Sequence, residues 1–164
     1  FAPPQDVPSH FSKMNETPRF LPHVTVATVV PRDGKFLFVE EESAQGRVLN
    51  QPAGHLEANE TLVEAALRET LEETGWSVRA RSMIGVYQWV APDGFTFVRV
   101  AFAADPVSYD PERKLDEGIV RALWLSPTEL EAQAERHRSP MVGALIRDYL
   151  GGARHPLSLA RFIA

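Results

Sequence analysis

One stretch, GHLEANETLVEAALRETLEETGW at residues 54–76, constrains the chain more than any other. Thr61 followed three residues later by Glu64 forms a capping box, which predicts that a helix begins near Leu62. Gly75 is suited to the left-handed conformation that commonly ends a helix. The stretch is rich in glutamate, although like charges one turn apart cost a helix a few tenths of a kcal/mol per pair. We therefore expect something to offset that repulsion.

The carboxylates of Glu69, Glu72 and Glu73 are predicted to lie together. They are three and four positions apart, so they share one helix face and can converge on one point. Oxygen ligands without cysteine select Mg²⁺ or Mn²⁺ over zinc. The pattern predicts a cage for a hard divalent cation, whereas the alternative is an ordinary solvated acidic face. The opposite, apolar side of the helix is predicted to carry Leu62, Val63, Ala66, Leu67 and Leu71.

The side chain of Arg68 is predicted to point away from the cage. It is adjacent to Glu69 but about 100° away around the helix, so we expect it to stay outside the cage. A pair with Glu60, or a hydrogen bond to a loop carbonyl, suits it better.

The spacing of these residues resembles the Nudix box, G-x5-E-x7-R-E-U-x-E-E-x-G-U, where U is a bulky apolar residue. The departures fall at apolar positions, where Thr70 is only half apolar and Trp76 is large. The resemblance implies an α+β protein with the Nudix fold, an α/β/α sandwich around a mixed sheet. It also implies hydrolysis of nucleoside diphosphates linked to another group. Every fixed position is occupied, by Gly54, Glu60, Arg68, Glu69, Glu72, Glu73 and Gly75.

The resemblance also implies roles for individual residues. Glu69, Glu72 and Glu73 would hold the metal, together with the backbone carbonyl of Ala53 or Gly54. Gly75 would be a structural residue of the box.

Further roles follow from the same resemblance. Arg68 would be one of the catalytic residues, and it would pair with Glu60 to brace the loop of the box. Members of the family often carry one more acidic residue ahead of a strand with a tryptophan. Glu117 is our first choice for this additional ligand, and Asp116 is the second. Either Glu69 or Glu117 is the candidate general base.

The rest of the chain predicts mixed secondary structure. Asp-Gly pairs at residues 33–34 and 93–94 are typical of hairpin turns. Residues 105–118 are predicted to form a loop, and Ser-Pro pairs at 126–127 and 139–140 are predicted to begin two helices. The order of strands, helix, strands and helices predicts an α+β class. The predicted strands cover residues 23–30, 35–41, 83–91, 95–104 and 119–125.

Composition sets the remaining bounds. With 164 residues, 44% of them hydrophobic, the chain suits one domain, which we expect over residues 22–164. Residues 1–21 are expected to be a flexible arm, of which 1–13 are partly non-native, with Met14 as a candidate start. The lack of cysteine favours a reducing cytoplasm. No apolar run reaches the roughly 20 residues of a membrane span.

The formal net charge of −5 bears on possible partners. Such a surface weakly repels polyphosphates, so a nucleic-acid polymer is not expected and a phosphorylated small molecule needs local compensation. A bound cation would supply it. The sequence is compatible with either a monomer or a homodimer.

A closer resemblance within the family covers residues 23–163 and is to the bacterial NudJ-type phosphatases. It is carried most clearly by PAG at residues 52–54 and by the QWVAP segment, whereas Leu49 departs from a common tryptophan. This resemblance implies Mg²⁺-dependent removal of terminal phosphate from nucleoside tri- and diphosphates, hydroxymethylpyrimidine pyrophosphate and thiamine pyrophosphate. The alternatives are MutT-like release of pyrophosphate, hydrolysis of ADP-ribose, and a nucleotide sensor without turnover.

Four further side chains are candidates for contacting the substrate. Alternation places Tyr87 and Trp89 on one face of their strand, where an aromatic ring near the metal can stack on a base. Arg99, inside an apolar strand, is a candidate phosphate ligand. His55 lies beside the metal loop. The alternative is structural: aromatic residues of strands often belong to the core, and a strand arginine often faces solvent.

Overall fold

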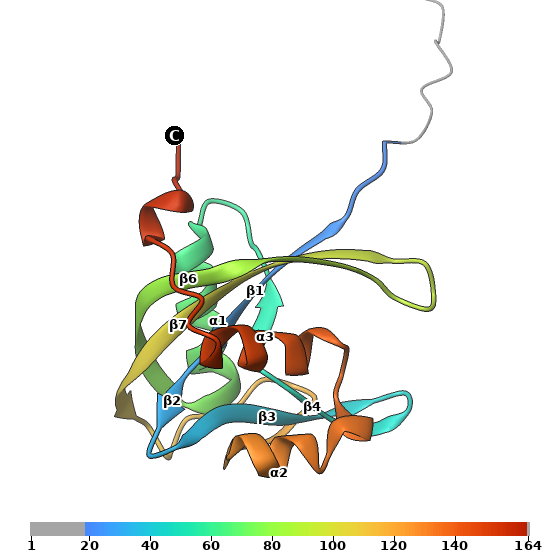
Figure 1. Cartoon of the computed structure of the whole chain (residues 1–164), viewed down its shortest axis with the longest axis vertical. Helices are drawn as coiled ribbons and strands as arrows, with labels where there is room; N and C mark the ends of the chain where they lie inside the picture. The colour runs from blue at the N-terminus through green and yellow to red at the C-terminus, as the bar shows by residue number, and fades with distance from the viewer. Residues whose placement is uncertain (1–18, 164) are drawn as a thin grey trace, which may run out of the picture.

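The computed structural model describes residues 19–163 (Figure 1). The predicted arm, 1–21, falls mostly outside the described residues, and residues 19–22 form no regular secondary structure. The strands are β1 (His23–Val29), β2 (Pro31–Arg32), β3 (Lys35–Ser43), β4 (Gly46–Asn50), β5 (Ala53–His55), β6 (Trp76–Val90), β7 (Thr96–Tyr109) and β8 (Ile119–Leu125). The helices are α1 (Leu62–Thr74), α2 (Pro127–Glu131) and α3 (Met141–Leu150), with short 3-10 helices η1 (Ala134–Arg136) and η2 (Leu157–Leu159).

In the described part of the chain these strands form two four-stranded sheets. The first has the order β5-β1-β7-β6, in which β1 and β7 are parallel and the other pairs are antiparallel. The second contains β2, β3 and β4, with β8 paired to the other side of β3. The predicted α+β class with a mixed sheet is confirmed.

Helices α1 and α3 cover opposite faces of the first sheet. Because side chains alternate along a strand, neighbouring residues of β1 reach different helices. Val26 packs with Ala65 and Ala66 of α1. Ala27 and Val29 face the cluster that contains α3. This alternation fixes α1, and therefore its carboxylates, against the sheet.

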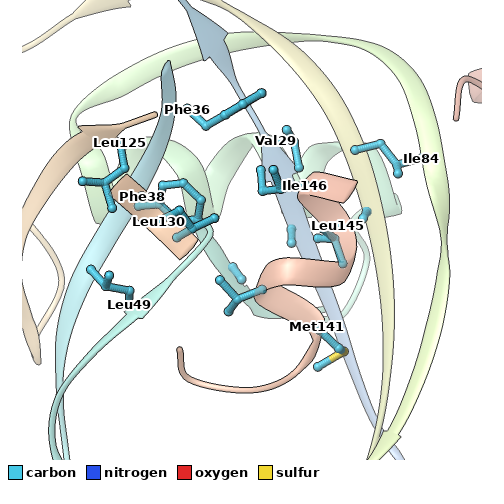
Figure 2. Close-up of a cluster of buried hydrophobic side chains, with 14 of the residues drawn as sticks. Val29, Phe36, Phe38, Leu49, Ile84, Leu125, Leu130, Met141, Leu145 and Ile146 are labelled. Carbon is cyan, nitrogen blue, oxygen red and sulfur yellow. The ribbon is translucent and has the colours of Figure 1, made fainter. Parts of the chain in front are cut away.

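The cluster on the α3 side joins the two sheets (Figure 2). It gathers side chains from both sheets, α2 and α3, and burying each large apolar side chain contributes roughly 1.5–3 kcal/mol. This core holds the elements around the site in fixed positions. Labelled members in Figure 2 are Val29, Phe36, Phe38, Leu49, Ile84, Leu125, Leu130, Met141, Leu145 and Ile146.

The turn of the first predicted hairpin is confirmed, but the strand that pairs with β3 across this turn differs from the predicted one. Asp33 and Gly34 have φ of 50° and 74°, as a tight hairpin turn requires. However, the strand paired with β3 at this turn is the short β2, not the run at 23–30. That run forms β1 in the other sheet. Its residues are buried on both faces, so it needs strands on both sides and helices above and below.

Other boundaries also differ from those expected. Residues 105–109, predicted as loop, extend β7 and pair with the first half of β6, where Trp76 stacks on Tyr109 at 5.0 Å. The helix that begins after Ser126 is short, because α2 ends at Glu131. Strands β4 and β5 were not predicted. Among the described residues, no helix is long and apolar enough to cross a membrane.

Candidate active site

Helix α1 begins and ends where the sequence predicts. Thr61 Oγ1 accepts a hydrogen bond from Glu64 N at 3.1 Å, and the Glu64 carboxylate accepts one from Thr61 N at 2.8 Å. Gly75 closes the helix with φ of 74°. The helix therefore has a fixed start, a fixed end and a fixed rotation about its axis.

A carboxylate triad lies at the surface of α1. Glu69, Glu72 and Asp116 each place one oxygen within 4.8 Å of the others. Asp116 is held there because its N–H donates to the Glu72 carbonyl at 3.1 Å. Glu69 is buried, whereas Asp116 is exposed. The geometry therefore favours Asp116, the second choice, over Glu117 as the additional acidic residue, because its backbone is tied to the last turn of α1. The role of either residue as a metal ligand remains a prediction.

Glu73 lies apart from this triad. Its Oε2 accepts a hydrogen bond from Ala53 N at 2.9 Å, and its side chain is buried. Burial raises the pKa of the Glu73 carboxyl to about 9, although the Ala53 N–H acts in the opposite direction. The predicted convergence holds for Glu69 and Glu72 but not for Glu73, which points to β5.

Gly54 of β5 lies directly against the triad. A Cβ atom on residue 54 would overlap the carboxylate of Glu69. The backbone of the loop can approach this carboxylate only because residue 54 has no side chain. This close approach explains the glycine at the first fixed position of the box.

Arg68 makes the predicted brace and a further contact that was not expected. Its guanidinium donates to both carboxylate oxygens of Glu60, at 2.9 and 2.7 Å, and to the His55 carbonyl at 3.1 Å. Its Nη1 also donates to Glu69 at 2.8 Å and to Glu72 at 3.0 Å. The prediction that Arg68 stays outside the cage is therefore wrong. Residues 68 and 72 are one turn apart, and a guanidinium has five N–H donors.

The residues fit a hard divalent cation. Nη1 of Arg68 lies between oxygens of Glu69 and Glu72, so these two carboxylates already share one positive group. Burial raises the pKa of Glu69, and the guanidinium of Arg68 opposes that shift. An all-oxygen donor set of this kind suits Mg²⁺ or Mn²⁺.

Arg99 is deeply buried in β7, with 6% of its surface exposed. Its Nε donates to Thr25 Oγ1 and its Nη1 to Asn50 Oδ1, both at 3.3 Å. Burial lowers the pKa of Arg99 to about 10, and the charges of Glu41 and Glu73 oppose this shift. The interpretation as a solvent-facing strand arginine is wrong. Its possible contact with phosphate remains a prediction.

The two aromatic substrate candidates, Tyr87 and Trp89, lie in different surroundings. Tyr87 OH donates to Asp148 of α3 at 2.7 Å, which makes Tyr87 a tether between sheet and helix. Trp89 stacks on Phe97 at 5.7 Å between ring centroids. As expected, Tyr87 and Trp89 both pack against the cluster on the α3 side. Only Trp89 of these two lines the cleft described next.

A cleft of about 730 Å³ lies between three segments that are far apart in the sequence. They are the β3–β4 turn with the start of β4 (43–48), the β6–β7 hairpin (89–97), and the segment 134–140 that enters α3. Figure 1 shows these segments on the same side of the molecule. Apart from Trp89, no sequence pattern predicted this cleft, because no spacing rule links segments so far apart.

His55 lies between the box and the neighbouring strand β1. Its Nε2 is 3.1 Å from His23 Nδ1, and the two rings make an edge contact. Burial, together with the charges of His23 and Arg99, lowers the pKa of His55. Its backbone carbonyl is one of the acceptors of Arg68.

Comparison with known proteins agrees with this geometry. The chain matches the NUDIX domain family over residues 20–145. It is 49% identical over 140 residues to Phosphatase NudJ of Escherichia coli K12, which covers 85% of this chain and 91% of that protein. A NUDIX hydrolase from Nitrosomonas europaea has a TM-score of 0.85 at 46% identity, covering 87% of this chain and 98% of that one.

More distant structures share the fold alone. An ADP-ribose pyrophosphatase from Streptococcus suis is 15% identical, with a TM-score of 0.61 over 83% of this chain and 96% of that one. The box geometry and the two high-identity relatives lead to one conclusion: the chain belongs to the Nudix family and is a hydrolase of phosphorus-containing acid anhydrides.

Proposed function

We propose that this protein is a Mg²⁺-dependent phosphatase of the NudJ type. It releases the terminal phosphate of nucleoside tri- and diphosphates, and of hydroxymethylpyrimidine pyrophosphate or thiamine pyrophosphate. The observation that carries the proposal is the triad of Glu69, Glu72 and Asp116 against Gly54. The 49% identity to Phosphatase NudJ supports orthophosphate as the product.

The triad would hold the cation, with Glu73 and the backbone of the β5 loop as neighbours. A bound divalent ion neutralises polyphosphate charge and lowers the pKa of a bound water molecule. The protein's remaining task is to position the phosphate chain and to accept a proton. Glu69 is the better candidate base, because it is buried within the triad. Glu117, the other candidate, adjoins the ligand Asp116.

Arg68 and Glu60 position the triad without touching the substrate. Their paired hydrogen bonds fix the loop carrying His55 against α1. Arg99 adds a buried positive charge whose hydrogen bonds go to neutral oxygens. Such a cation near Glu73 suits the negative charge of a substrate's phosphate chain.

A product-resolved hydrolysis assay with Mg²⁺ tests this function. The substrates are nucleoside tri- and diphosphates, hydroxymethylpyrimidine pyrophosphate, thiamine pyrophosphate and ADP-ribose. We expect orthophosphate from all of these compounds except ADP-ribose, and no activity in EDTA. Pyrophosphate or ribose 5-phosphate as the product would instead support the MutT-like or ADP-ribose alternatives. Binding without turnover would support a nucleotide sensor.

A cytoplasmic location also remains a prediction, which rests on the composition of the chain.

A further inference from the structure

In the part of the chain that the structure describes, the second half of β6 is a sheet edge with no strand beside it. Strand β6 is last in the order β5-β1-β7-β6, so only one of its sides pairs with β7. Ala91 N–H donates to the Phe95 carbonyl across the hairpin, which sets the alternation of main-chain groups along β6. The N–H and C=O groups of Val86, Gln88 and Val90 therefore point away from β7. Within residues 19–163 they have no hydrogen-bond partner.

This free edge is bounded at both ends. At one end His155 pairs with Met83, whose N–H donates to the His155 carbonyl at 2.9 Å and whose carbonyl accepts from His155 N–H at 2.8 Å. At the other end lies Pro92, which has no N–H to donate. Figure 1 shows the tip of the β6–β7 hairpin projecting beyond α3. Residues 86–90 are therefore open to one further short strand.

The free edge lacks the features that normally prevent strands from pairing. Natural edge strands commonly carry charged side chains, proline or β-bulges. The charged residues of β6, Arg79 and Arg81, are exposed in its first half, and its register shifts lie between residues 77 and 85. Residues 83–91, MIGVYQWVA, contain no charged residue and no proline. Such an edge favours the addition of another strand.

The sequence of the free edge is complementary to itself. It reads VYQWV, which is nearly the same in both directions about Gln88. If two copies pair antiparallel about Gln88, each Val86 faces Val90 of the other copy and each Tyr87 faces Trp89. Every outward N–H and C=O group of the edge then has a partner. Aromatic pairs stabilise antiparallel strands, and the exposed valines lose contact with water.

Helix α3 leaves room for a second copy. It contacts both β1 and β6, so it lies over β7, the strand between them. The two copies of α3 would then be three inter-strand spacings apart, about 14 Å. Packed helices need roughly 8–10 Å between their axes. The helices of the two copies therefore do not overlap.

Opposite charges lie near both ends of the paired edges. The same register sets Asp93 of one copy opposite Met83 of the other, where the exposed Arg154 adjoins His155. A twofold axis repeats this pair of charges at the other end. The free edge therefore matches itself in main-chain groups, side chains and charge, which selects a second copy of this chain as its partner.

We infer that the protein forms a twofold homodimer in which the β6 edges of two copies pair antiparallel about Gln88. The pairing joins the two four-stranded first sheets into one continuous sheet. The inference does not depend on the proposed function, because the dimer is detected by its mass.

A charge exchange at the two valines tests this pairing. Val86 and Val90 are 60% and 58% exposed, so substitution there leaves the core intact. In Val86→Lys with Val90→Lys, like charges lie directly opposite each other between copies. In Val86→Lys with Val90→Glu, the same positions carry opposite charges. Within one strand the two positions are about 14 Å apart, so these charges meet only between copies.

The control is Val107→Lys, a substitution of an exposed valine at the other end of β7. Sedimentation velocity of the full chain over a concentration series measures the dimer. Wild type, control and the lysine–glutamate variant should dimerise with similar dissociation constants. The double-lysine variant should dissociate roughly 10-fold or more readily, because two charge pairs repel each other.

Three outcomes would overturn the inference. They are a wild type that is monomeric at every concentration, an unchanged dissociation constant in the double-lysine variant, and equal weakening in both double variants. Circular dichroism checks that each variant is folded.

Hydrogen exchange of the wild type gives a second test that needs no variant. The amide protons of Val86, Gln88 and Val90 should exchange more slowly in concentrated than in dilute protein. The amide proton of Lys114, in an exposed loop, should exchange equally in both. Exchange of the three edge amides at the same rate in both samples would refute the pairing.

Discussion

Two regions of the molecule are built in different ways: the carboxylate end, which is the triad of Glu69, Glu72 and Asp116, and the cleft end, which is the cleft lined by Trp89 and Phe97. The carboxylate end comes almost entirely from one continuous segment, residues 54–75, with Asp116 added from a loop. The cleft end comes from three segments between residues 43 and 140. The first end is acidic and held by helix caps and Arg68, whereas the second is aromatic and formed at hairpin turns. We therefore expect the chemistry to depend on the local spacing of the box, and substrate preference to depend on loops, which tolerate change.

The largest expected effect comes from the carboxylate end. Glu72→Gln should lower kcat by about 10³-fold, because a ligand of the proposed cation is lost. Glu72 also accepts a hydrogen bond from Arg68, so stability should change by no more than about 1 kcal/mol. Glu131→Gln, on exposed α2, is the charge-matched control. Full activity in Glu72→Gln would show that the chemistry does not depend on the carboxylate end, and the contrast between the two ends would then be wrong.

Gly54→Ala should have the next largest effect. The added Cβ would overlap the Glu69 carboxylate, so either the loop or α1 must shift. We expect kcat to fall by roughly 10²-fold and stability to fall by about 1–3 kcal/mol. Steady-state kinetics and urea unfolding measure the two effects. Wild-type kinetics would show that the close approach of β5 to Glu69 is dispensable.

The pH dependence of stability reports on the buried Glu73. Its folded-state pKa of about 9 lies above the value of about 4.3 in an unfolded chain. Because the pKa of Glu73 is higher in the folded protein, its protonated carboxyl stabilises the fold. This stabilisation is fully present below the unfolded-state pKa and is lost as the pH rises through the folded-state pKa. In EDTA, wild-type stability should therefore fall between pH 6 and pH 9, by roughly 4 kcal/mol more than in Glu73→Gln, because each of these three pH units changes the free energy of unfolding by about 1.4 kcal/mol.

Urea unfolding of both proteins at the two pH values measures this difference. An identical slope in the variant would show that the Glu73 carboxylate is already charged in the folded protein.

The smallest expected effect comes from Tyr87→Phe, which tests whether Tyr87 belongs to the cleft. Tyr87→Phe removes the hydrogen bond to Asp148, so stability should fall by about 1 kcal/mol. KM for ATP should not change, because Tyr87 tethers α3 and does not line the cleft. A raised KM with unchanged stability would instead assign Tyr87 to the substrate, as the sequence had suggested.

Local patterns predicted the carboxylate end well. The capping box at Thr61 and the glycine at position 75 placed both ends of α1, because these signals act within one helical turn. The direction of Arg68 was misjudged, since angular position ignores the reach of a long side chain. The choice between Asp116 and Glu117 depended on a backbone hydrogen bond to Glu72, which no one-dimensional pattern reveals.

Long-range arrangement limited the other predictions. The Asp33-Gly34 turn was correct, but the turn alone does not say that β1 leaves for the other sheet. The burial of Arg99 follows from its place between β1 and β4, which the sequence does not state. The cleft requires the relative positions of three distant segments. The fold class needed only the order of elements, which explains why it was predictable.

Hydrolysis of a nucleoside diphosphate in ¹⁸O-labelled water, with Mg²⁺, tests the central claim most directly. If the triad directs water to the terminal phosphorus, ¹⁸O will appear in orthophosphate and not in the nucleoside monophosphate. Glu72→Gln should lose this labelled product. Label in the monophosphate would place the attack at the inner phosphorus and contradict the claim that the triad directs water to the terminal phosphorus. Equal turnover in EDTA would contradict the proposed metal dependence.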